Sequence, residues 1–328
     1  MQNKTRQPRT LREYITLFLT GIGMGAADSV PGVSGGTVAF VRGIYADLLN
    51  AIKSVNVDLL KLVLKLDFKG IMNHVPWRFL ITLGAGILTA IFTLARLVSY
   101  LMENQRVFLF AFFFGLVMAS AVAVGGKLKK WSILNIVALL AGAAAAFIIV
   151  GMIPAERDHQ PLTLFLSGFV AIMAMILPGI SGSSILLILG QYEYILNSVR
   201  DFNLLPVAIL GLGCVFGIMI FSRILSWLLN RYPQVTIAVL IGFVIGSLRA
   251  VWPWQSESTV TVEGIAETVR TAVMPEFASG EFVIALVICL IGFLIVTLID
   301  HLESHDNPLL RLVWKPHRAE YVHPAEQN

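Results

Sequence analysis

The sequence predicts an all-α integral membrane protein with inverted-topology repeats, about six transmembrane helices and two re-entrant helical hairpins. Three observations predict this fold class. The 328 residues are 57% hydrophobic and only 13% charged, whereas soluble domains carry about 25% charged residues. The apolar runs are continuous, unlike the alternating strands of a membrane barrel. Finally, one stretch of the sequence occurs twice, and each copy is interrupted by proline and glycine.

The repeat divides the chain. Residues 16–56 align without gaps with residues 163–203, and 15 of 41 positions are identical. A second block aligns residues 83–120 with residues 210–247, with 11 of 38 identities. We therefore predict a first repeat over residues 1–153, a second over residues 154–300 and a tail over residues 301–328. Matching helix breaks in two halves indicate the central binding site of a transporter.

Six apolar stretches are long enough, or nearly so, to cross a hydrocarbon core of about 30 Å. They are Phe79–Leu101, Val107–Val124, Trp131–Ile153, Leu205–Leu229, Val235–Val251 and Phe282–Ile299. The two proline–glycine segments are too short to cross, so we expect re-entrant hairpins at about 15–52 and 162–198. An amphipathic insertion at residues 58–77 follows the first hairpin. A loop at residues 252–280 precedes the last span.

Loop charges orient these elements. Basic residues near the N-terminus, at positions 53–69, at positions 127–130 and at positions 311–318 all fall on one side, which the positive-inside rule assigns to the cytoplasm. The acidic stretches 156–160 and 257–276 fall outside. Both termini are then cytoplasmic, and the loop at residues 252–280 is external. Each repeat crosses an odd number of times, so the two halves are inverted.

The repeated P-G-[VI]-S-G motif is the candidate binding site. Glycine permits close approach of a ligand to the backbone, and proline leaves neighbouring backbone groups unpaired. Helices that restart after the breaks direct their positive ends at a shared cavity, which favours an anion. The candidate residues are Ser34, Gly35, Gly36, Thr37, Ser181, Gly182, Ser183 and Ser184. The alternative is structural, because glycine and serine also allow close helix packing and serine often bonds its own backbone.

Arginines inside apolar segments are candidates for holding a phosphate. Arg96 and Arg223 occupy matching repeat positions within predicted spans. A central arginine costs at least ~2.5–3.5 kcal/mol to insert, so it normally faces a cavity or a partner. A guanidinium binds phosphate through two hydrogen bonds and stays charged. The alternative is that each side chain extends to the lipid head groups or bonds a helix-end carbonyl. Arg42, in the first hairpin, is a third candidate.

Two acidic residues are candidates for coupling transport to an ion, either a proton or sodium. Asp28 lies three residues before Pro31, where the second copy has Met175. A carboxylate in an apolar helix break can carry a proton. Asp28 is equally suited to capping a helix or to pairing with Arg42. Glu193, which aligns with Ala46, is the second candidate.

Several kinds of chemistry lack a sequence signal. The chain has no G-x-x-x-x-G-K-[ST] nucleotide loop and no dense basic cluster with interleaved aromatics. The H-L-E-S-H sequence at residues 301–305 stands at the end of the last span without further metal ligands. We therefore expect no metal, no cofactor and no nucleic-acid partner.

The sequences A-D-S-V-P-G-V-S-G-G-T at residues 27–37 and L-P-G-I-S-G-S-S at residues 177–184 resemble the signatures of a bacterial polyprenyl-phosphate (undecaprenyl-phosphate) translocase family. This family was formerly a domain of unknown function, and the resemblance covers nearly the whole chain. It implies a non-enzymatic transporter that returns a lipid carrier from the outer to the inner leaflet of the cytoplasmic membrane for reuse in cell-wall synthesis. It also implies that residues 34–37 and 181–184 surround the lipid head group.

The physics suits such a substrate. A bare anion in a low-dielectric medium costs tens of kcal/mol, whereas a polyprenyl tail can stay in the hydrocarbon. A protein that shields only the head group therefore suffices. Two other function classes stay open from the residues alone. One is a channel or exchanger for inorganic anions, and the other is a membrane lipid phosphatase, although no histidine lies within a predicted span.

Overall fold

The computed structural model describes residues 5–30, 32–126, 128, 131–152, 158–262 and 265–304. Several sequence predictions fall outside the described residues. They are the proline of the first break, Pro31, the lysines of the 127–130 cluster, residues 156 and 157 of the acidic stretch 156–160, and the tail from residue 305 onward.

The first half of the chain forms eight helices. Their bounds are α1 (Leu11–Asp28), α2 (Gly35–Val41), α3 (Tyr45–Lys53), α4 (Val57–Leu64), α5 (Phe68–His74), α6 (Trp77–Asn104), α7 (Arg106–Gly125) and α8 (Ile133–Val150). The second half contains α9 (Pro161–Ile176), α10 (Gly182–Ile188), α11 (Tyr192–Arg200), α12 (Leu204–Arg231), α13 (Pro233–Ser247), β1 (Gln255–Val262), β2 (Ile265–Ala272) and α14 (Gly280–Ser304). The described part of the chain is therefore helical apart from one β-hairpin.

Five helices in the described part of the chain are long and apolar enough to cross a membrane, namely α6, α7, α8, α12 and α14. The sixth predicted span is shorter than expected. Helix α13 has 15 residues, which corresponds to about 22 Å. Residues 248–251 turn instead of extending the helix, and the amide of Ala250 bonds the carbonyl of Ser247 at 2.9 Å. The prediction of a span over Val235–Val251 is therefore wrong at its end.

The segment after each proline–glycine break is divided into two short helices, whereas a single helix was expected. Gly43 separates α2 from α3 with a φ of +68°, and Gly190 separates α10 from α11 with a φ of +66°. A positive φ favours glycine and ends a right-handed helix. The two glycines align in the repeat, so both copies turn at the same point.

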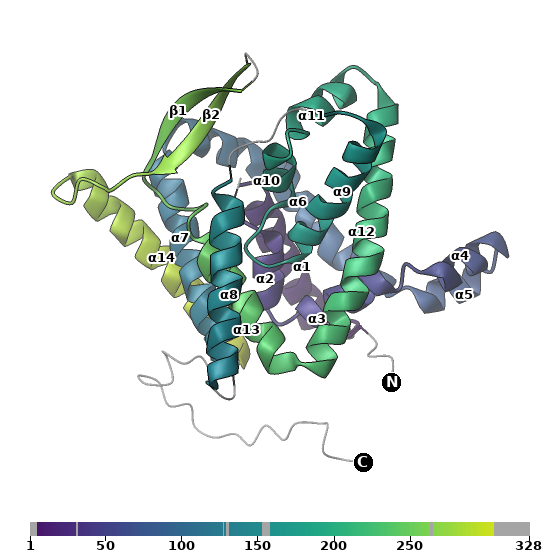
Figure 1. Ribbon diagram of the computed structural model, residues 1–328. Helices are drawn as coiled ribbons and strands as arrows, with labels where there is room; N and C mark the ends of the chain where they lie inside the picture. Colours follow the sequence, from purple (N-terminus) through teal and green to yellow (C-terminus); the bar gives the residue numbers. More distant parts are fainter. Residues whose placement is uncertain are drawn as a thin grey trace, which may run out of the picture.

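Two segments that connect the long helices have secondary structure of their own. Residues 255–262 and 265–272, within the loop at residues 252–280, form the antiparallel pair β1–β2, which the sequence analysis did not predict. The insertion at residues 58–77 forms most of α4 and α5, a helical hairpin that projects sideways from the bundle (Figure 1). Its exposed apolar side chains, Leu64, Leu66, Phe68 and Met72, agree with an amphipathic surface segment.

The long helices pack in pairs: α1 on α6, α9 on α12, α7 on α14, and α8 on α13. Glycines permit the closest approaches. A Cβ on Gly21 of α1 would stand 2.3 Å from the carbonyl oxygen of Leu83 on α6, and a Cβ on Gly168 of α9 would stand 2.2 Å from that of Leu210 on α12. The backbones of paired helices therefore touch directly, as in many membrane bundles.

The short helices lie toward opposite ends of the bundle. Helix α11 lies at the end that carries the β1–β2 hairpin, and α3 lies at the other end, where α4 and α5 project (Figure 1). The breaks that precede α2 and α10 lie between these ends. This arrangement brings the two P-G-x-S-G segments into the interior.

Candidate functional site

The first helix break is built from local hydrogen bonds. Helix α1 ends at Asp28, and the side chain of Ser29 bonds back to the carbonyl of Gly25 at 2.8 Å. Gly32 then takes a φ of +86°. Ser34 caps α2, because its hydroxyl accepts the amide of Gly36 at 3.2 Å. One helix thus ends and another starts within a few residues, so the predicted helix break is present at this motif.

The second break repeats this geometry with different capping. Helix α9 ends at Ile176, Gly179 has a φ of +92°, and α10 starts at Gly182 after Ser181. The hydroxyl of Ser181 lies 2.7 Å from the hydroxyl of Ser183 rather than capping a backbone amide. Ser181 is buried, Ser184 is half-buried and Ser183 is exposed. This break therefore presents hydroxyls on both its inner and its outer side.

The first break and the start of α3 contact the end of α9. The buried hydroxyl of Tyr45, at the start of α3, donates to the carbonyl of Ile176 at the end of α9, with a distance of 2.7 Å. Gly36 lies against the same region, because a Cβ at this position would stand 3.3 Å from the carbonyl oxygen of Met175. The first break therefore packs on the end of the helix that precedes the second.

The end of α13 forms a third wall of this site. A Cβ on Gly32 would stand 2.9 Å from the Cβ of Ala250. A Cβ on Gly179 would stand 2.5 Å from the hydroxyl oxygen of Ser247. The glycine of each P-G motif thus contacts residues 247–250, and both positions combine a positive φ with close backbone approach.

The amides at the two breaks differ in their partners. At the first break, Asp28 accepts the amide of Gly35 at 2.7 Å, and the backbone carbonyl of Ser34 accepts the amide of Thr37 at 3.0 Å. At the second break, where Met175 replaces Asp28, the amides of Gly182, Ser183 and Ser184 have no acceptor within the described residues. The second break therefore keeps its N–H groups available, whereas the first places a carboxylate where an anion would bind.

Asp28 is therefore a helix cap in this structure, which was one of the alternatives drawn from its position. Thr37 is the most unusual polar group nearby. Its side chain is 1% exposed, and its hydroxyl has no hydrogen-bond partner in the described part of the protein. A buried hydroxyl without a partner costs about 1–3 kcal/mol. An unpaired buried hydroxyl at a helix break is typical of a group that binds a ligand or a water molecule.

The candidate arginines do not share one location. The Nε of Arg42 donates to the hydroxyl of Thr20 at 3.2 Å, inside the first hairpin. Arg96 on α6 and Arg223 on α12 are both exposed. The guanidinium of Arg223 bonds the carbonyl of Met219 on its own helix. Glu193, the second acidic candidate, is exposed on α11.

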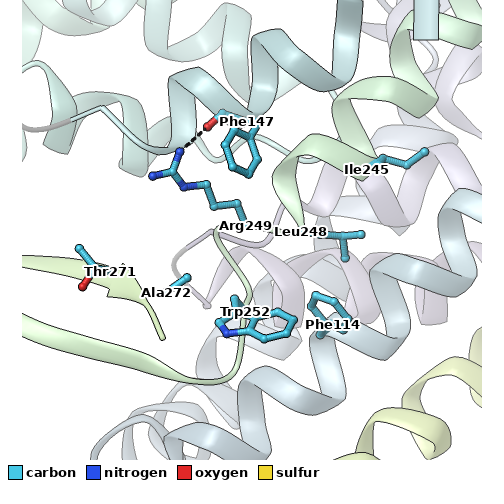
Figure 2. A pocket seen from close by; sticks show the side chains of 8 residues that line it. All are labelled: Phe114, Phe147, Ile245, Leu248, Arg249, Trp252, Thr271 and Ala272. Atoms are coloured by element: carbon cyan, nitrogen blue, oxygen red, sulfur yellow. Dashed lines mark hydrogen bonds between the residues drawn. The ribbon is translucent and has the colours of Figure 1, made fainter. Parts of the chain in front are cut away.

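A separate cavity of about 540 Å³ opens beside this site (Figure 2). Side chains from α7, α8, the end of α13 and β2 line it: Phe114, Phe147, Ile245, Leu248, Arg249, Trp252, Thr271 and Ala272. Arg249 bonds the carbonyl of Phe147 at 3.1 Å, and its guanidinium lies 4.5 Å from the centre of that ring. The cavity contains none of the predicted site residues, although Arg249 is adjacent to the Ala250 that contacts Gly32.

Tyr45 and the end of α13 are the parts of the site that sequence reasoning missed. Tyr45 and Tyr192 are identical in the repeat, and that identity was the available signal. Ser247 also has a matching residue, Ser120, in the first half. Elsewhere, the described residues bring no three histidine, cysteine, aspartate or glutamate side chains together as a metal site.

Comparison with known proteins gives consistent results. The model of the undecaprenyl phosphate translocase-like family matches residues 24–269, which include both breaks. The chain is 42% identical over 256 residues to a polyprenyl-phosphate transporter of Vibrio cholerae serotype O1, covering 78% of this chain and 83% of that protein. It is 29% identical over 257 residues to a polyprenyl-phosphate transporter of Staphylococcus aureus, covering 72% of this chain and 85% of that protein. No solved structure matches.

Proposed function

Because the chain belongs to the undecaprenyl phosphate translocase-like family, we propose that it carries polyprenyl phosphate across the bacterial cytoplasmic membrane. The direction is from the outer to the inner leaflet, which returns the lipid carrier for reuse in cell-wall polymer synthesis. The protein acts as a secondary transporter and not as an enzyme. The phosphate head group of the lipid binds where the two broken helices meet.

One observation carries this proposal. The first break packs on the end of α9, just before the second break. The polar groups of the two breaks include three N–H groups at residues 182–184 and the hydroxyl of Thr37, none of which has a partner in the described structure. Backbone N–H groups and hydroxyls bind phosphate oxygens well, because they donate without carrying a competing charge. Ser34, Ser181 and Ser184 supply further hydroxyls.

The halves are proposed to be inverted repeats. Matching helix pairs support this, since α1–α6 corresponds to α9–α12, and α7–α14 corresponds to α13–α8. The matching positive φ angles of Gly32 and Gly179 support it as well. Helices α3 and α11 lie at opposite ends (Figure 1), as expected if one hairpin enters from each side of the membrane. With basic loops inside, both termini are cytoplasmic. Transport then proceeds by rocking one half against the other.

We further propose that protons drive the cycle through Asp28. Its carboxylate accepts the amide of Gly35 and so occupies the first break. An arriving phosphate is repelled by this charge, whereas protonation of Asp28 removes the repulsion and weakens the cap. Proton binding and phosphate binding therefore favour each other at this site.

A leaflet-accessibility assay tests the proposed function. Purified protein in proteoliposomes is supplied with labelled polyprenyl phosphate in one leaflet, and the label that reaches the other leaflet is measured. Wild type is expected to move the lipid, and Ser34→Ala with Ser184→Ala is expected to slow it at least about tenfold. Chloride that competes with the lipid would favour an anion exchanger, and release of inorganic phosphate would favour a phosphatase. Either result would overturn the proposal.

A further inference from the structure

A cation pair lies outside the two helix breaks, on α3 and α12. Lys53 is the last residue of α3, and its Nζ donates to the hydroxyl of Ser226 on α12 at 2.9 Å. Arg223 precedes Ser226 by one helical turn. Burial and, secondly, the nearby charge of Arg223 lower the pKa of Lys53. Two positive side chains from different elements thus lie close enough to repel each other.

These cations have no acidic partner in the described structure. The ion pairs found there join Arg6 to Asp47 and Lys61 to Asp58, and neither includes Lys53 or Arg223. Adjacent like charges without a counter-charge form a local positive potential that an anion relieves. Arg223 is exposed and Lys53 is half-buried, so an anion reaches both from the protein surface.

A small hollow beside Ser226 is lined by polar and apolar side chains alike. A hollow of about 30 Å³ lies beside Ser226 and is also lined by Asn50 and Asn230. A hollow of this size holds about one water molecule. A phosphate group would therefore bind on the open side, against Arg223, with Lys53 and Ser226 behind it.

The sequence repeat provides a second set with the same chemistry. The alignment pairs Lys53 with Arg200 in one block, and it pairs Arg223 with Arg96 and Ser226 with Ser99 in the other. Each half therefore supplies two cations and one hydroxyl. Arg200 is the last residue of α11, which lies at the opposite end of the molecule from α3 (Figure 1). Arg200 thus lies at the opposite end of the molecule from Lys53.

The two sets differ in their hydrogen bonding and in their exposure. Helix α3 packs on α12 and holds Lys53 on Ser226. Arg200, Arg96 and Ser99 are all exposed, and the described residues offer none of them a partner. The tyrosines agree with this difference, because Tyr45 is 3% exposed and bonded, whereas its counterpart Tyr192 is 41% exposed. The repeated chemistry is therefore bonded and more buried on α3, and exposed on α11.

We propose that Lys53, Arg223 and Ser226 at one end, and Arg200, Arg96 and Ser99 at the other, form two equivalent sites that receive the phosphomonoester head group of a polyprenyl lipid at the two membrane faces. This inference rests on the proposed function and adds a receiving site on each side of the serine-lined breaks. Arginine binds a phosphate through two hydrogen bonds, and lysine adds a point charge. The isoprenoid tail stays in the lipid beside the exposed faces of α6 and α12.

Transport from each face separately tests this inference. Full-length protein of known orientation in proteoliposomes is supplied with labelled polyprenyl monophosphate in one leaflet at a time. The double variant Lys53→Gln/Arg223→Gln is expected to raise the half-saturating lipid concentration about tenfold from the α3 face only. The double variant Arg96→Gln/Arg200→Gln is expected to do the same from the α11 face only. The maximal rate at saturating lipid changes less than the half-saturating concentration.

Matched variants control for charge and folding. Lys53→Arg is expected to restore binding, and Lys65→Gln, on an exposed lysine after α4, is expected to leave both faces unchanged. The single variants Arg223→Gln and Arg96→Gln alter exposed side chains. The half-saturating lipid concentration can therefore be measured with them even if a double variant fails to fold. Polyprenol and inorganic phosphate serve as competitors, and neither is expected to match the lipid phosphate. Equal competition by inorganic phosphate would overturn the lipid assignment.

The failure of this inference differs from the failure of the proposed function. If both double variants show wild-type saturation from both faces while Ser34→Ala slows transport, the two receiving sites do not exist but the transporter does. If one double variant affects both faces equally, its residues act centrally and the inference is overturned. If wild type moves no lipid phosphate from either face, the proposed function itself is wrong.

Discussion

The hydroxyl of Tyr45 donates a 2.7 Å hydrogen bond to the carbonyl of Ile176, which lies 131 residues later in the chain. Ile176 is the last residue of α9, and carbonyls in the last turn of a helix lack an intrahelical donor. Tyr45 supplies that donor from the other half of the molecule. The start of α3 thus supplies a hydrogen-bond donor to the end of α9, just before the second break.

Replacing Tyr45 by phenylalanine removes this link while keeping the ring. We expect Tyr45→Phe to lower the free energy of unfolding by about 1–3 kcal/mol, because a buried carbonyl loses its partner. Thermal unfolding in detergent measures the loss. Transport is expected to fall as well, since the contact that positions the two breaks is weakened.

The repeat provides the matched control. Tyr192 aligns with Tyr45 but is 41% exposed. Tyr192→Phe is therefore expected to change the unfolding free energy by less than about 0.5 kcal/mol. Equal destabilisation by the two variants would contradict a specific role for the Tyr45 bond.

Thr37→Val separates stability from function. Valine has nearly the shape of threonine but lacks the hydroxyl, which is buried without a partner. We expect the variant to be as stable as wild type, or more stable by about 1 kcal/mol, because an unsatisfied polar group is removed. We also expect weaker binding of polyprenyl phosphate, measured by titration of the purified protein. Unchanged lipid affinity would argue against a ligand for this hydroxyl.

Ser222 on α12 is the control for Thr37. Its hydroxyl is also buried without a partner, but it lies outside the two breaks. Ser222→Ala is expected to keep or raise stability in the same way, with lipid affinity unchanged. Loss of affinity in both variants would show that removing any buried hydroxyl disturbs the protein.

Asp28→Asn tests proton coupling. Asparagine still accepts the amide of Gly35 but carries no charge, so the cost in stability is expected to stay within about 1 kcal/mol. Wild-type transport is expected to rise when a proton gradient is imposed across the proteoliposome membrane, whereas the Asp28→Asn rate is expected not to respond. Glu193→Gln, on an exposed side chain, is expected to respond like wild type. A normal response of Asp28→Asn would leave Asp28 as a structural cap only.

Two glycines on α6, separated by one residue, test the packing of α1 on α6. A Cβ on Gly86 would stand 2.2 Å from the carbonyl oxygen of Phe18, whereas a Cβ on Gly84 would meet nothing within 4 Å. We expect Gly86→Ala to destabilise the protein by about 1–3 kcal/mol through overpacking. Gly84→Ala is expected to be neutral or slightly stabilising, because alanine favours the helix. Thermal unfolding of both variants checks this, and equal stabilities would contradict the close packing of α1 on α6.

The sequence predicted the long helices well because their signal is additive over many residues. The bounds of α6, α7 and α12 lie within a few residues of the predicted spans. The positions of both helix breaks were also predictable, since P-G pairs interrupt a helix regardless of context. The division of each returning segment at Gly43 and Gly190 was missed, because a single glycine inside an apolar run does not by itself predict a turn.

Individual side chains in the site were harder to predict. The two breaks look alike in sequence, yet Asp28 caps one of them and nothing caps the other in the described structure. The repeat aligns Arg96 with Arg223, but the exposure of both side chains depends on which helix face packs against a neighbour. The bond from Tyr45 to Ile176 joins residues from different halves, and no local pattern encodes such a contact.

Photocrosslinking locates the head group. A polyprenyl phosphate that carries a diazirine on the carbon next to the phosphate is bound to the protein, irradiated and mapped by mass spectrometry. We expect label in both peptides, the one containing residues 34–37 and the one containing residues 181–184, and we expect unlabelled lipid phosphate to remove it. Label confined to the cavity around Arg249 and Trp252, with both serine-containing segments unmodified, would contradict binding where the two broken helices meet.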